Sequence, residues 1–174
     1  MKETFTYDAF ISYRHADLDK YVAEQLHKKL ESFRLPPAAK KVRFEGRTKI
    51  RRIFRDKDEL PISSDLANPI ITALHESEFL IVICSPDTPS SAWVEREIKT
   101  FISLHGRENI LAVLIAGEPE ESFPQALRRA KHRVTYKDGR TAVKEVDVEP
   151  LAADIRGRTK RQIMRNLNAE LLRL

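Results

Sequence analysis

Two segments of the chain are apolar at every position, and they constrain the fold more than any other feature. Residues 79–84 read Phe-Leu-Ile-Val-Ile-Cys, and residues 110–115 read Ile-Leu-Ala-Val-Leu-Ile. Runs this short suit strands, and a strand without polar positions suits a parallel sheet whose two faces are both covered by helices. Between them, Val94, Ile98 and Phe101 recur at helical spacing. The sequence therefore predicts a strand–helix–strand unit.

The same alternation extends along most of the chain. Strands are expected at 7–12, 50–54, 79–84, 110–115 and 151–155. Helices are expected at 17–33, around 66–74, at 91–104, briefly at 123–127, and from Thr159 onward. Residues 134–148, with a Lys-Asp-Gly turn at 137–139, indicate a hairpin. Alternating strands and helices predict a parallel sheet with helices on both faces and right-handed crossovers.

Composition indicates a globular chain without a membrane segment. The chain has 174 residues, of which 41% are hydrophobic and 33% charged, and this favours a single folded domain. No apolar run approaches the ~20 residues of a membrane span, and the N-terminus lacks the apolar segment of a secretion signal. The single cysteine, Cys84, excludes an internal disulfide and suits a reducing, cytoplasmic setting. The last apolar stripe stops at Leu174, which suggests a domain cut from a longer protein.

The net charge of +5 is moderate. Basic residues cluster at 40–43, 47–52 and 128–133 and in the final helix. Aromatic residues are not interleaved with these charges as stacking platforms would be, so nucleic acid is an unlikely partner. Solvated surface is the simpler interpretation of the clusters.

Chemically capable residues follow several of the predicted strands. In an open parallel sheet, ligands bind outside the carboxyl ends of the strands. Ser12, Tyr13 and Arg14 end the first strand, Asp56 follows the second, and Ser85 follows the third. We therefore expect these side chains to lie along one edge of the sheet.

The helix after the third strand begins with Trp-Val-Glu-Arg-Glu at 93–97. Trp93 and Glu97 are four residues apart, which places a ring beside a carboxylate. Helical periodicity puts the pair at the boundary between the core stripe and solvent. Glu97 could stabilise positive charge on a flat cationic ligand, or it could simply favour the helix dipole. Glu95 points elsewhere and is expected to be a surface acid.

Four ordered blocks resemble the Toll/interleukin-1 receptor (TIR) domain, in its bacterial type. The blocks are 7–13 (Tyr-Asp-Ala-Phe-Ile-Ser-Tyr), 54–60 (Phe-Arg-Asp followed by Glu-Leu), 80–86 (Leu-Ile-Val-Ile-Cys-Ser-Pro) and 91–97 (Ser-Ala-Trp-Val-Glu-Arg-Glu). The resemblance implies that residues 1–174 form one TIR domain. It also implies a flavodoxin-like three-layer α/β fold with a five-stranded parallel sheet in the order 2-1-3-4-5.

The resemblance further implies an activity. Many bacterial TIR domains are NAD+ glycohydrolases or cyclases: they cleave the nicotinamide–ribose bond and release nicotinamide with ADP-ribose or a cyclic isomer. Their essential glutamate lies four residues after a tryptophan, which corresponds here to Glu97 after Trp93. NAD+ is then a substrate, and no cofactor or metal is expected. Such domains act by self-association, in bacterial immune (antiviral) signalling.

The resemblance also suggests a substrate-binding set. Trp93 would stack on a ring, Arg14 would meet the diphosphate, and Tyr13 would line the ribose or nicotinamide pocket. Surface exposure of Arg14 and core-edge packing of Tyr13 are the structural alternatives. The remaining members of the predicted set are Ser12, Asp56, Leu66 and Ser85. For Asp56, the alternative is that it braces its loop.

One departure and one alternative function qualify this assignment. The loop at 59–65, which mediates TIR–TIR contacts in the family, commonly carries a glycine and has none here. The geometry of assembly is therefore open. The alternative function is a non-enzymatic TIR scaffold that signals by homotypic contacts. A Rossmann glycine fingerprint, a Walker loop and metal-ligand histidine spacing are all absent from the sequence.

Overall fold

A parallel sheet forms the centre of the structure, a computed structural model that describes residues 5–34, 49–50, 52–55 and 67–171. The strands of this sheet are β1 (Tyr7–Ser12), β2 (Ile53–Arg55), β3 (Ser77–Cys84), β4 (Ile110–Leu114) and β7 (Ala152–Asp154). They lie in the order β2-β1-β3-β4-β7. This confirms the predicted flavodoxin-like α/β topology, with β7 as the fifth strand of the sheet.

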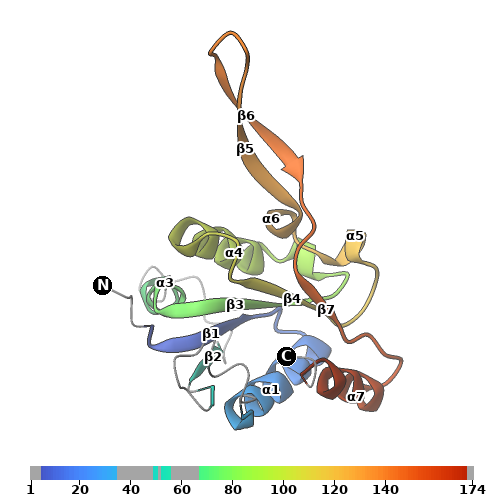
Figure 1. The fold of residues 1–174 in the computed structure, drawn as a ribbon. Helices are drawn as coiled ribbons and strands as arrows, with labels where there is room; N and C mark the ends of the chain where they lie inside the picture. The colour runs from blue at the N-terminus through green and yellow to red at the C-terminus, as the bar shows by residue number, and fades with distance from the viewer. Residues whose placement is uncertain (1–4, 35–48, 51, 56–66, 172–174) are drawn as a thin grey trace.

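Helices cover both faces of the sheet, as Figure 1 shows. The helices are α1 (Asp17–Ser32), α3 (Ala67–His75), α4 (Ala92–His105), α5 (Pro119–Ser122), α6 (Gln125–Arg128) and α7 (Lys160–Leu171). Helices α1 and α7 pack on one face, and α3, α4 and α6 pack on the other. In the part of the chain that the structure describes, no helix is both long and apolar enough to span a bilayer.

The position of β3 in the sheet explains why residues 79–84 are all apolar. Ile81 and Ile83 join the core beneath α1 and α7, whereas Leu80 and Val82 join the core beneath α3 and α4. Successive side chains of a strand point to opposite faces, so both sets must be apolar when both faces are covered. The parallel strands then bring their carboxyl ends to one edge of the sheet.

Helix α4 has well-defined ends. The Ser91 side chain accepts a hydrogen bond from the backbone N–H of Val94 at 3.3 Å and so caps the first turn. Gly106, with a φ of 85°, ends the helix in the left-handed region that favours glycine. These caps fix the start and phase of α4, and therefore the directions in which Trp93 and Glu97 point.

The second strand is displaced from its predicted position. Expected at 50–54, it runs over Ile53–Arg55, where Ile53, Phe54 and Arg55 pair with Ala9, Phe10 and Ile11 of β1. The Arg55 side chain contacts Glu24 of α1 at 3.3 Å. Pairing with β1 and this contact with Glu24 explain why the strand continues past the apolar residues to Arg55.

The predicted hairpin is longer than expected. Its strands are β5 (Arg129–Thr135) and β6 (Thr141–Asp147), so the hairpin begins five residues before the predicted start at 134. The basic cluster at 128–133 therefore lies mostly in a strand. The alternation of charges with Ala130, His132 and Val134 is the strand period, which charge clustering obscures in the sequence. In Figure 1 the hairpin projects away from the central sheet.

Candidate active site

Glu97 is the most unusual side chain on α4 because it is a buried carboxylate. Only 4% of it is exposed. Ser12, the last residue of β1, donates a hydrogen bond from its Oγ to Oε2 of Glu97, and this bond is buried. The expected position at the boundary between core and solvent is thus corrected: Glu97 lies beneath the helix, against the carboxyl end of β1. A buried carboxylate is costly without such donors.

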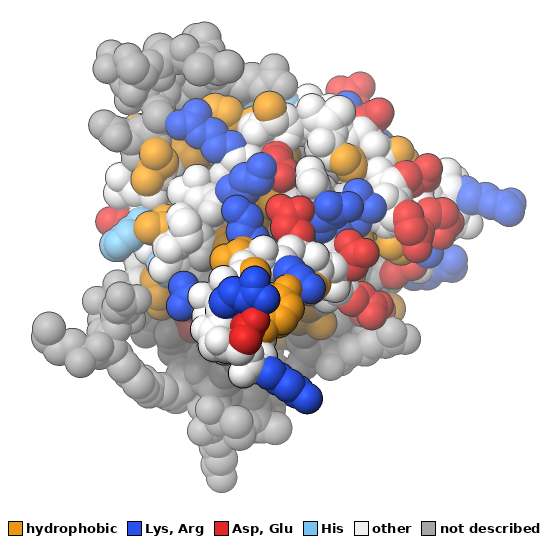
Figure 2. All heavy atoms as spheres, turned by 90° about the horizontal axis from the view of Figure 1, so that it is seen from above, with side chains coloured by type: hydrophobic (Ala, Val, Ile, Leu, Met, Phe, Trp, Pro, Cys, Tyr) orange, Lys and Arg blue, Asp and Glu red, His pale blue; other side chains and the backbone are white. Residues whose placement is uncertain are grey.

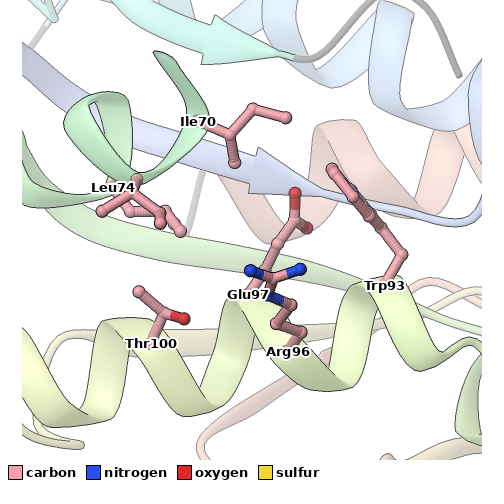
Figure 3. A pocket seen from close by; sticks show the side chains of 7 residues that line it. Ile70, Leu74, Trp93, Arg96, Glu97 and Thr100 are labelled. Carbon is pink, nitrogen blue, oxygen red and sulfur yellow. The ribbon is translucent and has the colours of Figure 1, made fainter. Parts of the chain in front are cut away.

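Glu97 lines a small pocket between α3 and α4, of about 290 Å³ including its mouth. The lining residues are Ile70, Ile71, Leu74, Trp93, Arg96, Glu97 and Thr100. Figure 3 shows the carboxylate of Glu97 pointing into the space between Ile70 and Trp93. The walls are mainly hydrocarbon, so a charge inside the pocket interacts strongly with that carboxylate.

Trp93 lies one helical turn before Glu97 and is half-buried. Its ring stands beside the carboxylate in Figure 3. The predicted pairing of a ring with a carboxylate is therefore present. Such an arrangement suits a flat ligand that carries positive charge, because the ring stacks on the ligand and the carboxylate balances its charge.

Arg14 follows β1 and belongs to a separate polar cluster at the same edge of the sheet. Its guanidinium lies 3.3 Å from Asp87 and 4.0 Å from Asp19, and the side chain is 33% exposed. Asp19 lies in the first turn of α1 and is 2% exposed. Burial raises the pKa of Asp19 above its ordinary value, although Ser85 and Arg14 oppose this effect. Arg14 is thus held by two carboxylates.

Ser85 directly follows β3 and is part of the same cluster. Its Oγ donates to Oδ1 of Asp19 at 3.1 Å, and its backbone N–H donates to Oγ1 of Thr88 at 2.8 Å. These bonds hold the turn between β3 and α4. Contact of Ser85 with a substrate stays a prediction.

Tyr13 takes a different position from the pocket residues. It is 2% exposed and packs in the core cluster beneath α1 and α7, with its ring stacked on His15 at 4.7 Å between centroids. The structure does not bring its ring into the pocket between α3 and α4. A role for Tyr13 at the substrate stays a prediction. Asp56 and Leu66 lie outside the described residues.

Two expectations about acidic residues change. Glu95 was expected at the surface, but it is only 19% exposed: its Oε2 accepts from the backbone N–H of Ala126 at 3.2 Å, and Lys99 lies 3.1 Å from Oε1. Asp19 was not identified from the sequence analysis, where it resembles any acid in a first helical turn. Its spacing of three, four and seven residues from Val22, Ala23 and Leu26 places it on the buried stripe of α1, and that is the signal that would have found it. Among the described residues, no group of three or more metal-ligating side chains comes together.

Comparisons with known proteins bear on this arrangement. A curated relative, NAD(+) hydrolase ApTIR from an Actinoplanes species, is 35% identical over 112 residues. That alignment covers 64% of this chain but only 14% of the relative, so the chain spans a small part of that protein. Among solved structures, one similar chain comes from the TIR domains of the activated Roq1 resistosome directly recognizing the pathogen effector XopQ. It is 23% identical to this chain with a TM-score of 0.46, and the superposition covers 66% of this chain and 61% of that one.

A family model described as the TIR-like domain of Thoeris protein ThsB matches residues 10–120. This segment includes the second half of β1, Glu97 and both apolar runs that govern the fold. Because the match covers more than half of the 174 residues, the chain belongs to the ThsB TIR-like domain family.

Proposed function

We propose that this chain cleaves NAD+ at the bond between nicotinamide and ribose. The observation that carries the proposal is the buried Glu97 carboxylate, which receives a hydrogen bond from Ser12 and points into a pocket beside Trp93. A carboxylate kept in an apolar pocket costs stability, which favours a role in chemistry. The name of the 35% identical relative, an NAD(+) hydrolase, supports the same activity.

The reaction needs little proton transfer. The bond between ribose C1′ and the nicotinamide nitrogen breaks, and its electron pair neutralises the positive charge of the leaving ring. Water adds to C1′ and releases one proton to solvent, giving ADP-ribose and nicotinamide. Positive charge develops on C1′ and the ribose ring oxygen in the transition state, as in glycoside hydrolysis. Glu97 stabilises this charge, and Ser12 positions the carboxylate.

The other polar groups would hold the rest of the substrate. Trp93 stacks on a ring of the dinucleotide, and Arg14 binds the diphosphate through its guanidinium. We retain Ser12, Tyr13, Asp56, Leu66 and Ser85 as proposed members of the binding set. An adenine nitrogen that attacks C1′ in place of water would give a cyclic product from the same intermediate.

The size of the pocket supports activation by assembly. A cavity needs roughly 10–15 Å³ of interior volume to hold one water molecule, and the interior of this pocket is only about 20 Å³. In the single chain the pocket is therefore too small for a nicotinamide ring. We therefore propose that a neighbouring TIR domain completes the site when the chains assemble, and that the activity serves bacterial immune signalling.

The proposal is tested by incubating the purified chain with NAD+ over a wide range of protein concentrations and identifying products by mass. We expect nicotinamide release that rises more steeply than protein concentration, and loss of release in Glu97→Gln. Glu95→Gln, two residues away on the same helix, is the matched control and should retain activity. The domain is a scaffold instead if no condition that assembles it consumes NAD+. A strictly linear concentration dependence contradicts activation by assembly.

A further inference from the structure

The β5–β6 hairpin is a ribbon with one apolar and one charged face. Seven residue pairs hold it in register, from Arg129↔Asp147 to Thr135↔Thr141. Side chains alternate between faces, and partners across the ribbon share a face. One face, called the apolar face below, carries the pairs Ala130↔Val146 and Val134↔Ala142 with Tyr136 beyond them, and it also carries the basic pair His132↔Lys144 between them. The other face carries Arg129, Lys131 and Arg133 on β5, with Asp147, Glu145 and Val143 opposite them on β6.

The apolar face is only partly covered by the part of the chain that the structure describes. Tyr136 is 41% exposed, and Val146 is also exposed. A two-stranded ribbon alone in water is marginally stable, so natural proteins cover one of its faces. At ~3.3 Å per residue the ribbon extends over roughly 23 Å, enough to reach across a neighbouring molecule.

The hairpin also carries unbalanced positive charge. Its three acids are already paired within it: Asp138 with Arg140 at 2.6 Å, and Glu145 and Asp147 with Arg129 at 3.4 and 3.7 Å. Lys131, Arg133, Lys137 and Lys144 have no carboxylate within ion-pair distance among the residues placed by the structure. A binding partner should therefore offer apolar surface bordered by negative charge.

Such a surface lies beside the base of the same hairpin. A cleft between α5, the hairpin base and β7 is lined by apolar Pro119, Phe123 and Pro150 and by acidic Glu120 and Glu149. Arg128 and Arg129 also line it, as do Asp147 and Asp154, which are paired with Arg129 and Arg156. Neither Glu120 nor Glu149 forms an ion pair with the described residues. Leu151, just outside this lining, is 70% exposed. Viewed along the hairpin in Figure 2, basic side chains gather at the centre, and most of the acidic side chains, interspersed with basic ones, lie to one side.

The edge strand adds a second feature of a docking site. Strand β7 ends the sheet, with β4 as its neighbour on one side only. An edge strand offers backbone N–H and C=O groups to a further strand. A basic ribbon and an acidic, apolar edge on one molecule form a patch that is complementary to itself under a two-fold rotation.

We propose that the hairpin of one copy docks on the cleft and β7 edge of a second copy, and that the second copy docks reciprocally. The apolar face with Val134 and Tyr136 covers Leu151, while Lys144 on that same face and Lys137 at the turn approach Glu120 and Glu149. This interface does not depend on the activity proposed above, and it uses residues other than those of the loop at 59–65.

A charge-swap experiment tests the proposal by sedimentation of the whole chain. The hairpin variant is Lys137→Glu/Lys144→Glu, and the cleft variant is Glu120→Lys/Glu149→Lys. We expect the parent chain to dimerise, and each variant alone to associate at least tenfold more weakly because like charges meet. An equimolar mixture should dimerise again, since each negative surface then meets a positive one. Circular dichroism and thermal melting of each variant check that the fold is retained.

Several results would overturn the proposal. One is a parent chain that stays monomeric at the highest soluble concentration. Another is self-association equally strong in both variants, which would place the contact elsewhere. A third is a mixture that associates no better than its components. If the basic hairpin instead serves an acidic macromolecule such as nucleic acid, the hairpin variant alone would lose that binding and the mixture would show no rescue.

Discussion

The bond between Ser12 and Glu97 permits a quantitative test of whether the buried carboxylate is there for stability or for chemistry. Glu97 is 4% exposed and Ser12 is 1% exposed, so both groups have little contact with bulk water. Ser12→Ala removes the donor and leaves the carboxylate less well satisfied. A buried acceptor that loses its donor costs about 1–3 kcal/mol. We expect Ser12→Ala to lower the free energy of unfolding by that amount.

Glu97→Met completes a double-mutant cycle. Methionine fills a similar volume and suits walls formed by Ile70, Leu74 and Trp93. In the Glu97→Met background the serine hydroxyl has lost its acceptor, so Ser12→Ala should be nearly neutral or stabilising. Urea unfolding of the four proteins should therefore give a coupling energy of about 1–3 kcal/mol. Coupling within about 0.5 kcal/mol of zero would refute the assignment of this bond.

The same cycle separates stability from function. Replacing a buried charge by a well-packed apolar side chain is often neutral or stabilising. Glu97→Met should thus unfold at a urea concentration equal to or above that of the parent, yet release no nicotinamide from NAD+. A strongly destabilised Glu97→Met protein would indicate that the carboxylate is a structural element, and the argument for catalysis would lose its physical basis.

Three further predictions concern other parts of the molecule. Because burial raises the pKa of Asp19, the folded state favours its protonated form, so ionising Asp19 costs stability as pH rises past the ordinary aspartate pKa. In urea unfolding, the free energy of unfolding of Asp19→Asn should equal that of the parent in acid and exceed it near neutrality. A difference that is constant across pH would contradict this. Trp93 is the only tryptophan, so its fluorescence should change on adding NAD+ to the catalytically silent Glu97→Gln variant, whereas an unaltered spectrum at saturating NAD+ argues against stacking. Gly117→Ala should destabilise the fold more than Gly139→Ala in thermal melts. Both glycines have positive φ, which costs an alanine roughly 1–2 kcal/mol, but a Cβ at Gly117 would lie 2.4 Å from Pro86 Cγ, whereas one at Gly139 meets nothing within 4 Å. Equal effects would show that the neighbours of Gly117 move aside at no cost.

The sequence predicted the sheet better than it predicted the site. Residues 79–84 of β3 and all of β4 are apolar because both faces of the sheet are covered, and that pattern can be recognised without tertiary information. The shift of β2 to Ile53–Arg55 was not readable, because its register depends on β1 and on the contact of Arg55 with Glu24. The hairpin start was missed because charge clustering concealed its strand period.

At the site, spacing placed Trp93 beside Glu97 but could not reveal burial. Periodicity gives the angle of Glu97 on the helix, whereas its depth depends on how closely α4 approaches the end of β1, where Ser12 lies. Asp19 lies on the buried stripe of α1, so periodicity places it inward, but its partner Ser85 is distant in sequence and could not be predicted. Long-range contacts between polar groups leave no local pattern.

The final segment of the chain also decides when folding can finish. The core cluster that contains the buried face of α1 is completed by four residues near the C-terminus: Ile155, Ile163, Leu167 and Leu171. All four lie beyond residues 10–120, the segment that matches the family model. A ribosome that has released only that stretch would present the apolar stripe of α1 without its partner helix α7. Contacts this distant in sequence form late, and the partly made layer is prone to aggregation until they do. The boundaries by which the family is recognised are therefore narrower than those by which this domain folds.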